Sequence, residues 1–259
     1  MLQKATRLKW VQGLGTGVDN LIDLPSLRPE VVVTNVRGIH GPPLSETALL
    51  YMLALSRRLP RSLRMQEERK WDRWPSALID GKTVGILGVG AIALDLAPKC
   101  KALGMRVVGI SSAPDRIPEG FDEMRSRADL AAACADLDFL VLLTPLTAET
   151  RHVVDAKVFA AMKPSSFLVN IARGGVVKEA DLIVALAEGR IAGAALDVFE
   201  RVPLPPDHPL WSAKNVIITA HLGGFHDRYI DDAIPIVFHN MTCFLEGAMD
   251  EMIYVVRRG

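Results

Sequence analysis

A glycine-rich turn is the first candidate binding site in the sequence. The apolar run KTVGIL at residues 82–87 is followed by GVGAIA at residues 88–93, and residues 91–103 then have a helical pattern. In a strand–turn–helix unit of this kind, the first glycine permits the tight turn, and the second lets the backbone approach a pyrophosphate at the helix N-terminus. Alanine is tolerated at the third position, which governs helix packing. We therefore expect a dinucleotide, rather than a purely structural turn, at Gly88, Gly90, Ala91 and Ile92.

The end of the next strand bears on the choice of cofactor. An acidic residue there would hold the ribose 2′-hydroxyl of NAD. The sequence instead has Ser111 and Ser112 after RVVGI, and Asp115 is the first carboxylate that follows. Arg116 lies close by and could face a 2′-phosphate, which favours NADP(H) over NAD. The alternative is that Arg116 is a solvated loop residue and that both cofactors are accepted.

The residues around this turn predict an α/β fold. Short apolar strands alternate with helices, and apolar strands of this kind indicate a parallel sheet covered on both faces. The predicted strands are residues 82–87, 106–110, 139–143, 167–171, 194–198 and 216–219. The predicted helices are residues 91–103, 128–135, 156–162 and 179–188. The expected architecture is a doubly wound parallel (Rossmann) sheet.

The two ends of the chain predict a second, smaller α/β lobe. Residues 8–35 contain two short apolar segments, LKWVQGLG and VVVTNV, and helical patterns occur at residues 46–59 and 234–245. We expect the smaller lobe to comprise residues 1–43 and 238–259, and the dinucleotide-binding domain to comprise residues 44–237.

Composition excludes several classes of partner. The chain has 259 residues with 30 basic and 30 acidic side chains, so nothing suggests a nucleic-acid or anionic-membrane surface. No apolar run approaches the ~18 residues of a membrane span, and the first ten residues lack the apolar stretch of a secretory signal. The three cysteines, at 100, 134 and 243, have no metal-ligand spacing. We expect a cytoplasmic protein without a bound metal.

Seven phrases of the sequence, in order and spacing, give it a family resemblance. They are GLGTGVD, GVGAIA, LLTPLTAETRHVVD, MKPSSFLVNIARGGVV, GAALDVFE, PLPPDHPLW and NVIITAHLGG. Together they resemble the D-isomer-specific 2-hydroxyacid dehydrogenases, the family of D-3-phosphoglycerate dehydrogenase and the glyoxylate/hydroxypyruvate reductases. The resemblance covers essentially the whole chain.

This resemblance implies two catalytic residues. Arg173, in NIARGG, matches the family's arginine, whose planar fork suits the carboxylate and carbonyl of a 2-oxo acid. His221, in TAHLGG, matches the general acid/base, which protonates the forming alkoxide as hydride arrives. The other five histidines lack such a frame, and we interpret them as surface or packing residues.

The resemblance also implies binding residues. Asp197 matches the aspartate that contacts the nicotinamide carboxamide, and Thr144 and Pro145 match the loop over the adenine. Thr16 and Gly17 belong to the loop whose backbone amides meet the substrate carboxylate. Ala172, His221 and Gly223 complete the expected cofactor contacts.

The sequence departs from the family in two places. The family pattern DVFxxEP has a glutamate that pairs with the histidine, and Val202 stands at that position. Glu200 is the nearest carboxylate and Asp207 a more distant one. Family members also carry further βα units before the segment at which this chain starts, so the smaller lobe is expected to be truncated and the cleft more open.

Three functions follow as hypotheses. The first is an NAD(P)H-dependent reductase of small 2-oxo acids, weakened by Val202. The second is a cofactor-binding sensor or interaction protein with little activity, and the third is a stable fragment without function. The family commonly dimerises through the helix that matches residues 46–58. A homodimer is therefore expected, and an ordinary core helix is the alternative.

Overall fold

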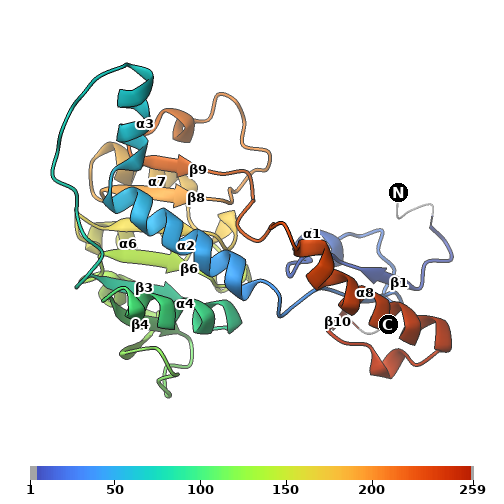
Figure 1. Cartoon of the computed structure of the whole chain (residues 1–259). Helices are drawn as coiled ribbons and strands as arrows, with labels where there is room; N and C mark the ends of the chain where they lie inside the picture. The colour runs from blue at the N-terminus through green and yellow to red at the C-terminus, as the bar shows by residue number, and fades with distance from the viewer. Residues whose placement is uncertain (1–4, 258–259) are drawn as a thin grey trace. The chain divides into compact units, whose positions relative to one another are not determined.

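The computed structural model describes residues 5–257 (Figure 1). By its internal contacts the chain divides into residues 1–40 with 225–259, and residues 41–224. From the sequence we expected the boundaries after residues 43 and 237. The expected smaller lobe also included residues 1–4 and 258–259, which lie outside the described residues. The second boundary differs because helix α8 (Tyr229–Glu246) is continuous and belongs entirely to the smaller unit.

The larger unit contains a seven-stranded parallel sheet in the order β5-β4-β3-β6-β7-β8-β9. Its strands are β3 (Thr83–Leu87), β4 (Arg106–Ser111), β5 (Glu123–Ser126), β6 (Phe139–Leu142), β7 (Phe167–Asn170), β8 (Gly193–Leu196) and β9 (Val216–Ile218). The predicted doubly wound sheet is confirmed. Strand β5 was not predicted, because it lies at the sheet edge, where its sequence EMRS needs no apolar pattern.

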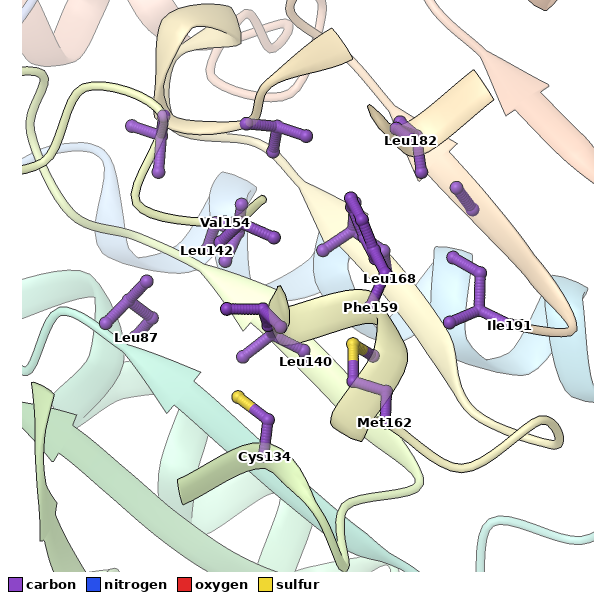
Figure 2. Close-up of a cluster of buried hydrophobic side chains, with 14 of the residues drawn as sticks. Leu87, Cys134, Leu140, Leu142, Val154, Phe159, Met162, Leu168, Leu182 and Ile191 are labelled. Atoms are coloured by element: carbon purple, nitrogen blue, oxygen red, sulfur yellow. The ribbon is translucent and has the colours of Figure 1, made fainter. Parts of the chain in front are cut away.

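Helices cover both faces of this sheet (Figure 1). One face packs against α2 (Gly41–Ser56) and α4 (Ala91–Ala102), and the other against α5 (Leu130–Cys134), α6 (Ala156–Ala161) and α7 (Glu179–Ala187). Successive side chains of a strand alternate between the two clusters. In β6, Phe139 and Val141 join the α2–α4 cluster, whereas Leu140 and Leu142 join the cluster drawn in Figure 2. This alternation is the pattern of a strand buried on both sides.

Further short helices connect these elements. Helix α3 (Leu59–Glu67) follows α2, and Arg58 in a left-handed conformation (φ 54°) separates the two. The 3-10 turns are η2 (Arg127–Asp129), η3 (Gly174–Val176), η4 (Pro209–Ser212) and η5 (Met249–Glu251). Among the described residues, no helix has both the length and the apolar character needed to cross a membrane.

The smaller unit has its own sheet and core. Its strands are β1 (Trp10–Gln12), β2 (Val32–Thr34) and β10 (Val255–Arg257), in the order β1-β2-β10. Strands β1 and β2 lie in the two predicted apolar segments and are parallel to each other, and the unpredicted β10 is antiparallel to β2. Helices α1 (Asp19–Ile22) and α8 complete the unit. Its buried core is formed by Leu27, Val31 and Val33.

The topology of the larger sheet determines where ligands bind. All seven strands are parallel, so their carboxyl ends meet at one edge. The chain runs outward from β3 to β4 and β5, then returns to β6 on the other side of β3. Ligands of open α/β sheets bind at such a switch point, outside the carboxyl ends of the strands. The predicted site residues of this unit lie at, or shortly after, the carboxyl ends of β3, β4, β6, β7, β8 and β9.

Candidate active site

The turn after β3 has the shape that a phosphate requires. Gly88 has a φ of 100°, and a Cβ there would lie 2.6 Å from the backbone nitrogen of Thr144. Gly90 precedes the first residue of α4, is exposed, and would place a Cβ more than 4 Å from any neighbouring atom. Ala93 is fully buried. The first turn of α4, with no side-chain cap on its N–H groups, is therefore open to an anion.

A cavity of about 320 Å³ adjoins this turn. It is lined by Leu87, Gly88, Ile110, Ser111, Ser112, Arg127, Thr144, Pro145, Thr147, Glu149 and Thr150. The structure thus brings five predicted cofactor residues to one cavity: Gly88, Ser111, Ser112, Thr144 and Pro145.

Two charged residues of this cavity were missed, and Arg116, which was expected at a 2′-phosphate, does not line it. Arg127 and Glu149 line the cavity, whereas Arg116 is exposed and does not. Arg127 follows β5 directly. The signal that could have found it was the position of a basic residue at a strand end, but the polar strand itself was not recognised.

Arg173 follows β7 on a tightly packed turn. Asn170 holds this turn from both sides: its side-chain oxygen accepts the Ala172 N–H at 3.1 Å, and its side-chain nitrogen donates to the Arg173 carbonyl at 3.0 Å. The next residue, Gly174, lies so close to the segment after β8 that a Cβ would be 1.9 Å from the Phe199 carbonyl carbon. These contacts fix the backbone from which the half-buried Arg173 side chain extends.

Asp197 positions the loop that carries His221. It follows β8 and is buried, and its carboxylate accepts the Leu222 and Gly223 N–H groups, each at 2.8 Å, and the Thr219 hydroxyl. Its carbonyl accepts the N–H of His221 at 3.0 Å. Sequence comparison suggested a contact with the nicotinamide carboxamide, which stays a prediction. The positioning role was not foreseen.

Helix α2 holds the same loop from its other side. The buried Tyr51 hydroxyl is hydrogen-bonded to Thr219, and Thr47 donates to the Gly223 carbonyl at 3.2 Å. Burial raises the pKa of Tyr51 against the opposing effect of the Thr219 hydrogen bond, and the Asp197 charge raises it further. Tyr51 is therefore neutral at physiological pH and serves as a hydrogen-bonding anchor.

His221 itself is exposed and lies in the left-handed region, with φ 57°. A non-glycine residue in this conformation costs of the order of 1 kcal/mol, and such residues cluster at functional sites. The described residues provide no hydrogen bond or ion pair to its imidazole. Its backbone is thus held firmly, while no carboxylate in the described part of the chain is bonded to its ring.

The carboxylates near Val202 do not replace the family's glutamate. Glu200 accepts the Glu179 N–H at 3.1 Å and lies 3.0 Å from Nε2 of His152, so it is engaged away from His221. Val202 is 66% exposed and precedes a cis proline. An apolar side chain in solvent contributes little packing, so position 202 tolerates other residues.

The predicted substrate loop belongs to the smaller unit and is described separately. The hydroxyl of Thr16 lies 2.9 Å from Nδ1 of His40, and its carbonyl accepts from the Asn35 side chain at 2.5 Å. The Tyr229 hydroxyl donates to the Leu14 carbonyl. Thr16 and Gly17 are exposed on this fixed loop. His40, which we had interpreted as a surface or packing residue, is therefore a partner of Thr16.

No metal centre accompanies these groups within the described ranges: no cluster of three or more histidine, cysteine or acidic residues could hold a metal ion. All three cysteines are buried and unpaired, and burial raises the pKa of Cys100 and of Cys134 to about 12. Cys100 and Cys134 are therefore thiols without the thiolate character of a metal ligand or nucleophile.

Comparison with known proteins gives consistent matches. The family model for the D-isomer specific 2-hydroxyacid dehydrogenase, NAD binding domain, matches residues 49–223. The glyoxylate reductase of Thermococcus gammatolerans is 35% identical over 257 residues, covering 95% of this chain and 76% of that protein.

A second relative, the D-3-phosphoglycerate dehydrogenase of Methanocaldococcus jannaschii, is 33% identical over 256 residues, covering 98% of this chain. The chain spans 48% of the length of that relative. Among solved structures, an NADPH-dependent glyoxylate/hydroxypyruvate reductase from Sinorhizobium meliloti, in complex with NADP and sulfate, superposes with a TM-score of 0.84 at 32% identity. That match covers 99% of this chain and 82% of the other.

Proposed function

Because this chain belongs to the D-isomer specific 2-hydroxyacid dehydrogenase family, we propose that it is an oxidoreductase that transfers hydride between NAD(P)H and a small 2-oxo acid. Glyoxylate and hydroxypyruvate are the substrates that the relatives suggest. One observation carries the proposal: Arg173 and His221 follow β7 and β9 at the same sheet edge as the phosphate-binding turn.

The bound cofactor supplies the hydride. NAD or NADP fits the residues present, because Gly90 leaves open space at the start of α4 and the adjoining cavity reaches the ends of β4 and β6. Gly88, Gly90, Ala91 and Ile92 would hold the phosphates, and Thr144 and Pro145 would border the adenine. Ala172, Asp197 and Gly223 are the contacts proposed for the nicotinamide end.

Arg173 would bind and polarise the substrate. A guanidinium presents two parallel N–H groups that match a carboxylate, and it also stabilises charge that develops on a neighbouring carbonyl oxygen. The turn fixed by Asn170 supports this assignment, because a preorganised cation need not rearrange during the reaction. For the smaller unit, taken by itself, the proposal is that the backbone N–H groups of Thr16 and Gly17, on an exposed loop, bind a substrate carboxylate.

His221 would donate a proton to the alkoxide as it forms, and would remove that proton in the reverse direction. Asp197 contributes by fixing the loop through its three carboxylate contacts. Val202 stands in place of the family's glutamate, and no carboxylate within the described residues is hydrogen-bonded to the imidazole of His221. We therefore expect slower reduction above neutral pH than a carboxylate-paired histidine would give.

The test is oxidation of NADPH and NADH with a panel of 2-oxo acids. Turnover that exceeds that of an Arg173→Ala control is expected for at least one small substrate. Equal rates for the two proteins would refute the dehydrogenase function. Tight NADPH binding without turnover would instead support the sensor hypothesis.

The proposal extends to assembly and location. Helix α2 buries Ala48, Tyr51, Met52 and Leu55 but exposes Leu50 and Leu53 by 58% and 41%. A helix that is apolar on its exposed side fits burial against a second copy. We place this homodimer in the cytoplasm, since its cysteines are unpaired. Light scattering of the wild type and of Leu50→Glu tests the interface: the wild type should be a dimer and the variant a monomer.

A further inference from the structure

The cavity beside the glycine turn has an unusual distribution of charge. Of the residues that line it, all within the described part of the chain, Arg127 is the single cation and Glu149 the single anion. Ser111 and Ser112 occupy the end of β4, where a carboxylate would accept hydrogen bonds from both ribose hydroxyls of NAD. The cavity therefore has a basic side chain and two hydroxyls where an NAD site would have an acid.

Strand register places Arg127 beside those serines. Strands β4 and β5 are parallel, and Ser111 is paired with Ser126. Arg127 comes directly after Ser126, so its backbone lies at the same end of the sheet as Ser112. The Ser126 side chain accepts the Ala128 N–H at 3.2 Å, which holds the backbone of η2 in place. Arg127 thus extends from a turn whose backbone is held by a hydrogen bond.

The opposite wall is also fixed. Buried Thr150 donates to the Pro145 carbonyl at 2.6 Å and accepts the Thr147 N–H at 2.7 Å, which braces the loop that carries Glu149. A hydrogen bond from Thr147 lowers the pKa of Glu149, and the Arg127 charge contributes in the same direction. Glu149 is therefore ionised at neutral pH and faces the same space as Arg127.

We infer that Arg127, together with Ser111 and Ser112, forms the subsite for the 2′-phosphate of NADP(H), and that Arg116 does not. The inference rests on the proposed use of a nicotinamide dinucleotide, and it names the residue that selects between the two. The guanidinium supplies charge-assisted hydrogen bonds to the phosphate oxygens, and the serine hydroxyls donate to the same group. Glu149 repels the phosphate and limits the preference for NADP(H).

The experiment measures binding alone. The dissociation constants of NADPH, NADH, adenosine 2′,5′-bisphosphate and 5′-AMP are determined by isothermal titration calorimetry for the wild type, Arg127→Gln and Arg116→Gln. Each of the two variants removes one positive charge from the larger unit, so Arg116→Gln controls for the change in net charge. Glu149→Gln tests the repulsion separately.

Arg127→Gln should weaken the binding of NADPH and of the bisphosphate about ten- to a hundredfold, which is the loss expected for hydrogen bonds to a charged group. The dissociation constants of NADH and 5′-AMP should stay within about twofold of the wild-type values. Arg116→Gln should change none of them, and Glu149→Gln should tighten NADPH severalfold. The inference is overturned if the wild type binds NADPH no more tightly than NADH, if Arg127→Gln weakens both equally, or if Arg116→Gln has the larger effect. These outcomes are independent of turnover. A protein that is inactive but shows the expected selectivity would refute only the proposed reaction. A protein that is active but lacks this selectivity would refute only the 2′-phosphate subsite.

Discussion

The two sides of the sheet edge hold their functional groups in different ways. On the side of β7, β8 and β9, the loop with His221 is fixed by the buried Asp197 and by Tyr51, so the chain determines the geometry before any ligand arrives. On the side of β3, β4 and β5, the chain leaves a cavity with charged walls. Catalysis needs groups in a set geometry, whereas cofactor selection needs charge and space. The following variants test whether these two sides are separable.

The largest effect is expected at His221. His221→Asn removes the acid/base group but keeps a residue that tolerates a left-handed backbone, so the loop should retain its conformation. We expect kcat for 2-oxo acid reduction to fall by about 10²- to 10⁴-fold, with NADPH affinity and the thermal midpoint nearly unchanged. Steady-state kinetics and a melting curve provide both numbers. A similar kcat for variant and wild type would remove His221 from the mechanism.

The glycine turn allows a matched pair of variants on the cofactor side. Gly90→Ala places a methyl group in open space, so folding should be unaffected. The dissociation constant for NADPH should rise at least about tenfold, because the methyl group occupies the phosphate position. Gly88→Ala should instead destabilise the fold by about 2–4 kcal/mol, because φ is 100° and the Cβ would clash with Thr144. Denaturant unfolding and calorimetry separate the two. Unchanged NADPH binding in Gly90→Ala would contradict a phosphate site there.

Position 202 tests whether the catalytic side is incomplete. A carboxylate beside the imidazole favours its protonated form, so Val202→Glu should raise the reduction rate severalfold at pH 8 and move the high-pH limb of the profile upward by about one unit. The exposed position of Val202 makes a folding penalty small. Val202→Gln is the control, since it adds polarity without charge. Identical pH profiles for all three proteins would show that residue 202 does not reach His221.

Some parts of the fold and of the candidate site could be predicted from the sequence, and others could not. The core strands were readable because residues such as Leu140 and Val141 must be apolar on both faces, and the glycine turn was readable because Gly88 has a conformation that other residues rarely adopt. Strand β5 and Arg127 were missed, since a polar edge strand has no hydrophobic period. The positioning role of Asp197 depends on hydrogen bonds across residues 197–223, and sequence spacing does not reveal such long-range contacts.

The smallest effect is expected at Tyr51, and it measures how independently the catalytic loop is held. Tyr51→Phe removes the hydroxyl that bonds to Thr219 but leaves all three contacts of the Asp197 carboxylate intact. One buried hydrogen bond contributes about 1 kcal/mol, so the free energy of unfolding should fall by that amount and kcat by about two- to fivefold.

Tyr229→Phe is the matched control for Tyr51→Phe, because its hydroxyl donates to the Leu14 carbonyl of the substrate loop in the smaller unit. It should raise KM for the 2-oxo acid and leave kcat nearly unchanged, whereas Tyr51→Phe should lower kcat. If Tyr51→Phe reduced kcat as strongly as His221→Asn, the loop would depend on α2 rather than on Asp197. The fixed geometry of the catalytic side would then derive from helix packing across the sheet rather than from the buried carboxylate at the end of β8.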